Sequence, residues 1–304
     1  AAVQHAPNLF AGASEGGCSA GCGGGTYVCK WCGLDYCPQG CDGTSCLGPP
    51  PLHLLYVEGG IGVGKSTALA TVAGEFAGDA RVEVLQEPVA RWEASGALRD
   101  MAEGAVFPFQ LLALATLMDQ LLVALLRLAA TRDARPTVLV VERSPRSNRE
   151  VFAVENLSAR QLAQYDEEHA GQMRVLREVL ATLAPVVETT VMLEAPVDAV
   201  VARIAERGRS EEASTPRAYH EALAARHEAL LAGLEHETVR TDASRPADAV
   251  AGELCALVRR RLGEAAVPDA CTCEPCATEG CEHLVTVRHG STAQCCDACT
   301  SGLD

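Results

Sequence analysis

The sequence predicts a three-layer α/β fold with a five-stranded parallel sheet, and three observations support this prediction. Short runs of β-branched residues alternate with long patterns rich in alanine and leucine, which is typical of βαβ units. A glycine-rich loop joins the first of these runs to the first helical pattern. The chain has 304 residues, of which 48% are apolar, so it can bury a sizeable core.

The predicted elements follow one another through the middle of the chain. Five apolar runs are predicted to be strands: 53–58, 82–86, 137–142, 189–194 and 237–241. Helical patterns fill the gaps: 65–77, 107–131, 158–183, 197–207, 216–233 and 246–262. The longest apolar pattern is interrupted by Asp119, Gln120 and Arg127, whereas a spanning helix needs about 20 predominantly apolar residues. We therefore expect no membrane segment.

Cysteine divides the chain into three parts. Of the 15 cysteines, seven lie in the first fifty residues and seven in the last forty. Three consecutive prolines at 49–51 form a rigid spacer after the first group. We expect a Cys/Gly-rich segment at 1–50, an α/β domain at 51–264 and a second Cys-rich segment at 265–304.

The loop after the first predicted strand reads GGIGVGKST and fits the phosphate-binding pattern GxxxxGK[ST]. Its glycines allow backbone N–H groups to converge on phosphate oxygens at the start of a helix. Lys65 is placed to reach the β and γ phosphates, and Ser66 to bind Mg²⁺. The predicted ATP-binding residues are Gly59, Gly60, Ile61, Gly62, Val63, Gly64, Lys65, Ser66 and Thr67. The alternative is a glycine turn before a helix, with no ligand.

Charged residues follow three other predicted strands. Glu87 ends the second strand, and Glu142 and Arg143 end the third. The segment RIAERGRSEE, residues 203–212, follows the helix after the fourth strand. Ligands of open α/β sheets bind at the carboxyl ends of the strands, so we expect these groups to converge on the phosphate loop. Alternatively, each is a solvated loop charge.

Together these segments resemble the deoxynucleoside kinase family, which includes deoxycytidine kinase, mitochondrial thymidine kinase and the insect multisubstrate enzyme. The matching segments are EGGIGVGKST, EPVARW, FQ, ERSPRSNREVFAVEN, RIAERGRSEE and YHEALAARHEALL, in the order of the family. They cover almost all of residues 54–235. Nucleoside monophosphate kinases share the phosphate loop but are not expected to combine EPVxxW with ERS. The resemblance implies a P-loop kinase-type fold that transfers the ATP γ-phosphate to a deoxynucleoside 5′-hydroxyl.

The resemblance also implies catalytic roles. Glu87 matches the general base that accepts the proton of the 5′-hydroxyl, a role that adds roughly 10²–10⁴-fold to the rate. Glu142 matches a carboxylate that holds Mg²⁺ directly or through water, and Arg143 contacts the reacting oxygen and phosphate. The family has a lid whose arginines close over the triphosphate and so exclude water. The matching residues here are Arg203, Arg207 and Arg209.

Nucleoside recognition transfers less evenly. Trp92 matches the pocket wall, Gln110 the glutamine that pairs with the base edge, and Phe152 the ring that stacks on the base. Glu212 matches the carboxylate that accepts a hydrogen bond from the 3′-hydroxyl of the sugar. Alternatively, Phe152 belongs to the core, Gln110 to a helix surface and Glu212 to a solvated loop. Family members usually add a tyrosine for the 3′-hydroxyl, but the segment between Trp92 and the FQ pair is shorter here and contains none.

Two positions bear on the choice of base. Family members that accept deoxycytidine together with purines carry an arginine and an aspartate where this chain has Leu117 and Asn148. Either member of a buried Arg–Asp pair would be an uncompensated charge without the other, so the absence of both residues here is physically consistent. Thymidine-using members have apolar or small residues at these places, and Leu117 fits that pattern. The Asn148 amide fits neither class, because it can donate or accept hydrogen bonds. We expect pyrimidine deoxynucleosides to be preferred.

The Cys-rich flanks lie outside the resemblance. In the C-terminal flank, nineteen residues separate two CxxC pairs, a spacing typical of a four-thiolate zinc site. The N-terminal cysteines are spaced closely enough for a compact zinc knuckle. The predicted ligands are Cys273, Cys276, Cys296 and Cys299, and in the N-terminal flank Cys29, Cys32, Cys37 and Cys41. Disulfides are the alternative, although a kinase that uses ATP belongs in a reducing compartment.

Charge limits the expected partners. Residues 263–304 contain seven Asp and Glu but one Arg, the opposite of what nucleic-acid binding requires. We expect ATP, Mg²⁺ and structural Zn²⁺ as cofactors, a deoxynucleoside as substrate, protein contacts through the flanks and a cytoplasmic location, with mitochondria as the alternative. Residues 111–127 could form a homodimer, although such an apolar stripe more often belongs to the core. The alternative functions are an inactive kinase-like core in a zinc-dependent interaction protein and a nucleoside monophosphate kinase.

Overall fold

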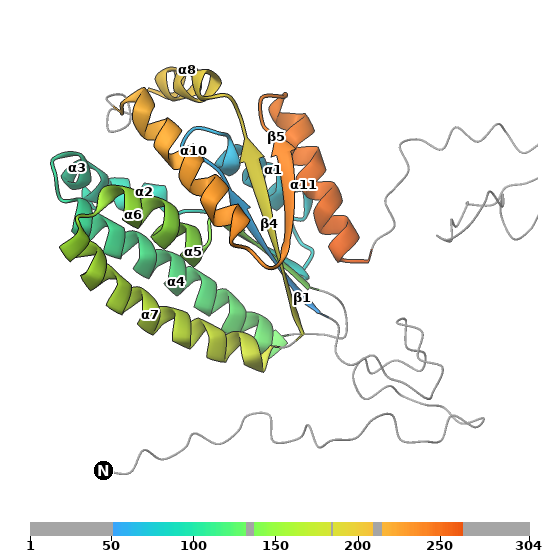
Figure 1. Cartoon of the computed structure of the whole chain (residues 1–304). Coiled ribbons are helices and arrows are strands. Elements are labelled where there is room, and N and C mark those ends of the chain that lie inside the picture. The colour runs from blue at the N-terminus through green and yellow to red at the C-terminus, as the bar shows by residue number, and fades with distance from the viewer. Residues whose placement is uncertain (1–50, 132–136, 184, 209–214, 264–304) are drawn as a thin grey trace, which may run out of the picture.

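Five parallel strands form the central sheet in the order β2-β3-β1-β4-β5. The strands are β1 (Leu52–Glu58), β2 (Val82–Leu85), β3 (Thr137–Glu142), β4 (Val186–Glu194) and β5 (Glu237–Asp242). They belong to a computed structural model that describes residues 51–131, 137–183, 185–208 and 215–263 (Figure 1). The predicted five-stranded parallel sheet is confirmed, with β4 beginning at Val186, a few residues earlier than expected.

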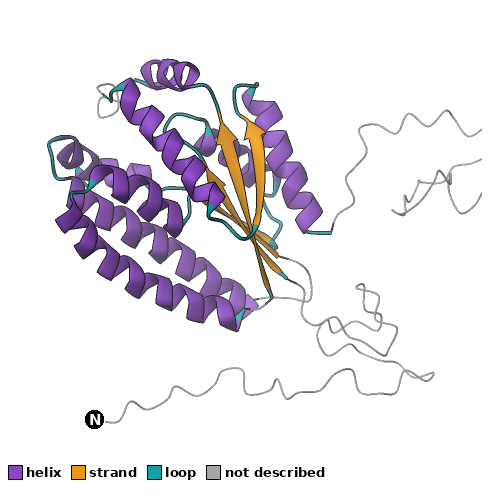
Figure 2. Cartoon of the chain, viewed as in Figure 1, coloured by secondary structure: helices purple, strands orange, loops and turns teal. Residues whose placement is uncertain are grey.

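Helices cover both faces of this sheet (Figure 2). Each of the six long helical patterns forms a helix: α1 (Lys65–Glu75), α4 (Val106–Thr131), α7 (Ala159–Thr182), α8 (Val197–Arg207), α10 (Arg217–Ala232) and α11 (Ala247–Arg261). Five short elements were not predicted: α2 (Val89–Ala94), α3 (Ala97–Ala102), α5 (Pro145–Ser147), the π-helix η1 (Asn148–Ala153) and α6 (Val154–Asn156). Each is too short to show helical periodicity.

Two hydrophobic cores lie on opposite faces of the sheet. Successive side chains of a strand point to opposite faces, so Leu55 and Val57 of β1 join one core and Leu54 and Tyr56 join the other. The first core includes buried residues of α1 and α11, and the second includes those of α4 and α7. This arrangement is the predicted three-layer order of helix, sheet and helix.

Helix α4 supplies much of the second core. By length and composition alone, Val106–Ala130 could also cross a membrane. Within the fold, however, Leu114, Leu121 and Leu125 are fully buried against the sheet and α7. Packing inside the domain therefore accounts for the apolar character of this helix.

The strand order places the functional site. The chain leaves the central strand β1 for β2 and β3 on one side and later for β4 and β5 on the other. A ligand crevice opens at such a reversal, beyond the carboxyl ends of the strands. The glycine-rich loop follows β1 at this point.

Candidate active site

The loop between β1 and α1 requires glycine at two positions. Gly59 has φ +140°, and an added Cβ would lie 2.6 Å from the carbonyl oxygen of Leu193. Gly62 has φ +79°, and an added Cβ would lie 2.6 Å from Ile204 Cγ1. Gly64 begins α1 without a side-chain cap, which leaves N–H groups of the first turn to a phosphate. The backbone thus forms a phosphate cradle that larger residues would close.

Lys65 is folded back onto this loop. Its Nζ donates hydrogen bonds to the carbonyl oxygens of Gly59 (3.0 Å) and Gly60 (2.9 Å). Burial, and then the charge of Arg143, lower the pKa of Lys65 to about 8. A phosphate that takes the place of the two carbonyls would favour the charged form of the lysine.

Oxygen atoms suited to a magnesium ion lie beside the lysine. Ser66 Oγ donates to Glu142 Oε1 at 2.9 Å, and Glu142 Oε2 accepts the backbone N–H of Glu87 at 3.3 Å. Mg²⁺ prefers oxygen ligands and usually binds through one or two protein groups together with substrate phosphates. Ser66 and Glu142 therefore fit the ion that an ATP-dependent transfer requires.

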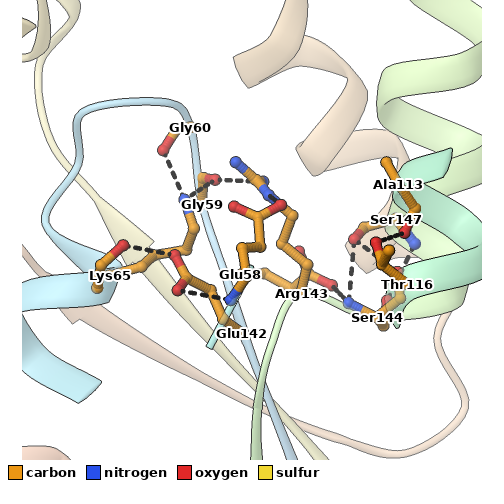
Figure 3. A network of polar contacts seen from close by, with 12 residues as sticks. Glu58, Gly59, Gly60, Lys65, Ala113, Thr116, Glu142, Arg143, Ser144 and Ser147 are labelled. Carbon is orange, nitrogen blue, oxygen red and sulfur yellow. Dashed lines mark hydrogen bonds and ion pairs between the residues drawn. The ribbon is translucent and has the colours of Figure 1, made fainter. Parts of the chain in front are cut away.

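Arg143 links the general-base candidate to the loop. Its Nε donates to Glu87 Oε1 at 2.7 Å, and a terminal nitrogen donates to the Gly59 carbonyl at 3.1 Å. The guanidinium also lies 4.1 Å from the centre of the Phe152 ring. Its φ of +66° is rare for a residue with a side chain, and such strain is typical of functional sites. Figure 3 shows the arginine with Lys65 and Glu142 at the start of the loop.

A buried carboxylate that sequence reasoning missed supports this turn. Glu58 Oε1 accepts the backbone N–H of Ser144 at 2.8 Å, directly after the strained Arg143 (Figure 3). Burial raises the pKa of Glu58, and its Oε2 lies 4.0 Å from Nε2 of the buried His227. Burial and the Arg143 charge lower the pKa of His227 to about 3. Only the position of Glu58 directly before the glycine loop hinted at a role.

The loop opens into a cavity of about 780 Å³. Trp92, Gln110, Asn148 and Phe152 line the part between α2, α4 and η1. Trp92 Nε1 donates to Thr116 Oγ1 at 3.2 Å, which holds the indole wall in place. The Oε1 atom of Gln110 is buried and has no hydrogen-bond partner within the described chain. A buried polar atom of this kind needs a partner, which a ligand can supply.

The remaining predicted residues are placed as follows. Arg203 lines the cavity and donates to the Val63 carbonyl at 3.2 Å, and Arg207 also lines it. Leu117 does not line the cavity but packs in the core beside α7. Arg209, Glu212 and all eight predicted zinc ligands lie outside the described residues. Within the described ranges, no group of three or more His, Cys, Asp or Glu side chains could hold a metal.

Sequence comparison assigns the domain. A model of the deoxynucleoside kinase family matches residues 55–251. The chain belongs to this family. The kinase is also 29% identical, over 227 residues, to the thymidine kinase of Ictalurid herpesvirus 1 (strain Auburn). That alignment covers 70% of this chain and 92% of the relative.

A solved structure resembles the kinase more distantly. It is the deoxyadenosine kinase from M. mycoides with the products dCMP and a flexible dCDP bound. The TM-score is 0.49 at 18% sequence identity, and the match covers 68% of this chain and 99% of the other. The family match, in contrast, shows that the chain is an ATP-dependent deoxynucleoside kinase.

The cavity of this kinase also contains residues that sequence reasoning did not single out. Tyr219 and Asn156 both line it, and Asn156 Nδ2 donates to the Tyr219 hydroxyl at 2.9 Å. They are the first and last residues of two family segments, YHEALAARHEALL and ERSPRSNREVFAVEN, so the signal was present without a role attached. Leu98 and Met101 come from α3, which was not predicted.

Proposed function

We propose that this kinase transfers the ATP γ-phosphate to the 5′-hydroxyl of a pyrimidine deoxynucleoside, with Glu87 as general base. One observation carries the proposal. The Glu87 carboxylate, held 2.7 Å from Arg143 Nε, lines the same cavity as the phosphate loop. A carboxylate in that position can take the proton of a hydroxyl group that attacks a phosphate in the loop.

The other residues of the loop side position the phosphates. Mg²⁺-ATP, when bound, supplies the phosphoryl group and neutralises part of its charge. Ser66 and Glu142 would hold the ion, and Lys65 would leave the Gly59 and Gly60 carbonyls for the phosphates. Arg203 and Arg207 line the loop side of the cavity and would contact the triphosphate, together with Arg209 of the predicted lid.

The helical side would hold the nucleoside. Gln110 has an unpaired Oε1 for an N–H of the base, and its amide nitrogen can donate to a carbonyl. Phe152 would stack on the base and Trp92 would form the wall, since both aromatic side chains line this part of the cavity. The Glu212 carboxylate would accept a hydrogen bond from the 3′-hydroxyl of the sugar.

Two observations support a pyrimidine over a purine. The herpesvirus relative is named a thymidine kinase. Asn148 is polar but uncharged and lines the cavity, so the pocket lacks the charged aspartate expected at this position in enzymes that also use purines. Leu117 is a core residue, so it adds no argument for either base.

The lining also opposes a nucleoside monophosphate as acceptor. A nucleoside monophosphate has a phosphate group of its own, and this group needs cationic partners in addition to those that bind ATP. Within the described base side, no Lys or Arg of α2, α3, α4 or η1 lines the cavity. The Arg143 guanidinium, on the phosphate side, is already bound to Glu87.

An ATP-dependent phosphorylation assay across the four deoxynucleosides and their monophosphates tests the proposal. We expect kcat/KM to be highest for thymidine or deoxycytidine. Deoxyadenosine or deoxyguanosine ranking first would overturn the pyrimidine preference. Turnover of monophosphates alone would overturn the assignment of the acceptor.

Three expectations outside the cavity remain proposals. We propose a cytoplasmic enzyme whose Cys-rich flanks bind structural zinc, which total metal analysis of the full chain would test. We also propose a homodimer through α4, because Val123 and Leu126 are exposed on it and Val175 is exposed on the neighbouring α7. Light scattering of the purified chain would measure that state.

A further inference from the structure

A buried hydrogen bond lies behind the base side of the cavity. The hydroxyl of Tyr165, on α7, donates to Oδ1 of Asn148, the first residue of η1. Tyr165 is fully buried, whereas Asn148 lines the cavity. Within the described chain, the Asn148 amide nitrogen donates no hydrogen bond, and it is not one of the fully buried polar atoms that lack a partner, so it is accessible from the cavity that Asn148 lines.

This bond determines which way the amide points. Asparagine offers an acceptor oxygen and a donor nitrogen, and either could in principle meet a hydroxyl. If the amide were reversed, the nitrogen would donate to the tyrosine and the phenolic proton would need another acceptor. Within the described residues the Tyr165 hydroxyl has Asn148 as its hydrogen-bond partner. An unsatisfied buried donor is costly, so the observed orientation is favoured.

The tyrosine is itself held firmly. Its ring stacks on His169 with centroids 5.9 Å apart, and His169 Nε2 donates to the Pro145 carbonyl at 3.0 Å. A second link joins α7 to η1: both carboxylate oxygens of Asp166, the residue after Tyr165, accept hydrogen bonds at 2.9 Å from Arg149, the residue after Asn148. Burial also raises the pKa of Tyr165, so the hydroxyl keeps its proton at assay pH. Helix α7 therefore presents a fixed donor to η1.

We propose that Tyr165 is a positioning residue for base selection: its hydroxyl holds the Asn148 amide so that N–H donors face the nucleoside. The inference rests on the proposed nucleoside side of the cavity. It makes the pocket complementary to a base that offers a carbonyl at this edge.

The donor pattern of the pocket separates the two pyrimidines. Thymine presents a carbonyl on each side of its N3–H, so either carbonyl can accept from Asn148 while N3–H donates to Gln110 Oε1. Cytosine presents one carbonyl, an acceptor at N3 and an amino group. In the pose that thymine adopts, cytosine N3 has no proton to donate to Gln110 Oε1, and where the amino group takes the place of a thymine carbonyl it opposes the Asn148 donors. The fixed amide therefore favours thymidine over deoxycytidine.

The test compares the two nucleosides in the full-length protein with Tyr165→Phe, which keeps the ring but removes the hydroxyl. We expect the ratio of thymidine to deoxycytidine kcat/KM to fall about tenfold, because the freed amide can turn its oxygen to the base. Calorimetric Kd values for both nucleosides measure the same ratio without requiring turnover. An enzyme that failed to phosphorylate any deoxynucleoside would refute the proposed function, and the Kd ratio would still decide this inference.

Two further variants separate positioning from packing. Arg149→Ala removes the neighbouring link between η1 and α7, so it should lower stability and leave the ratio unchanged. Adding Tyr165→Phe to Asn148→Ala should not change the ratio further, since the hydroxyl acts through the amide. Three results would overturn the inference: a wild-type preference for deoxycytidine, an unchanged ratio in Tyr165→Phe, or an equal loss of ratio in Arg149→Ala.

Discussion

The two sides of the cavity differ in how their polar groups are satisfied. On the phosphate side, formed by the loop and the strand ends, each hydrogen bond involves at least one charged group. Lys65 donates to the loop carbonyls, Ser66 donates to Glu142, and Arg143 donates to Glu87. On the base side, formed by α2, α3, α4 and η1, Gln110 keeps a buried oxygen without a partner in the described chain. The phosphate side is preorganised for charge, whereas the base side is completed by its substrate. Substitutions on the phosphate side should therefore change kcat or the kcat/KM for ATP. Substitutions on the base side should change the kcat/KM for the nucleoside.

The largest effect is expected from Glu87→Gln on the phosphate side. Glutamine keeps the shape and an oxygen for Arg143 Nε but cannot accept the proton, so kcat should fall by at least about 10²-fold. The Kd for the nucleoside, measured by calorimetry, should change by about twofold or less, since the pocket is preserved. A variant that turns over at nearly the wild-type rate would show that Glu87 is not the base.

On the base side, Gln110→Leu should separate function from stability. Losing both hydrogen-bonding groups should lower kcat/KM for the best nucleoside by about 10–100-fold. The free protein should not lose stability and should gain about 1 kcal/mol, because a buried oxygen without a partner is removed. Steady-state kinetics and thermal unfolding measure the two effects, and the KM for ATP is the internal control. An equal loss toward ATP would contradict the division between the two sides.

The pH dependence should reveal Lys65. Its pKa of about 8 means that the charged form needed for phosphate contact is lost as pH rises through that value. We expect kcat/KM for ATP to fall about tenfold between neutral pH and one unit above this pKa. With ATP saturating, kcat/KM for the nucleoside should fall only at higher pH, because bound phosphates stabilise the charged lysine. Profiles that coincide would argue against this role of Lys65.

The smallest effect is expected from removing the flanks. A chain shortened to residues 50–264 keeps both sides of the described cavity, so its kcat/KM should stay within about twofold of the full chain. It should also be insensitive to a zinc chelator, because the predicted zinc ligands are gone. A soluble but inactive shortened chain would show that the flanks complete the site.

The sequence by itself determined the phosphate side. The nine residues of GGIGVGKST are contiguous, so their pattern contains the cradle, the lysine and the start of the helix. Glu87, Glu142 and Arg143 could also be predicted to converge, because the carboxyl ends of parallel strands meet at one edge of the sheet. The structure brings all three to the cavity.

Only the tertiary structure decided the base side. Leu117 shares a helical stripe with Gln110, but seven residues at 1.5 Å each place it about 10 Å along α4, in the core instead of the cavity. The short helices α2 and α3 and the π-helix contain too few residues for their apolar positions to show a helical period in the sequence. Tyr165 and Asn148 meet because α7 packs against η1, and Glu58 faces His227 only after α10 has docked. Contacts between elements arise from packing, and local sequence patterns do not encode them.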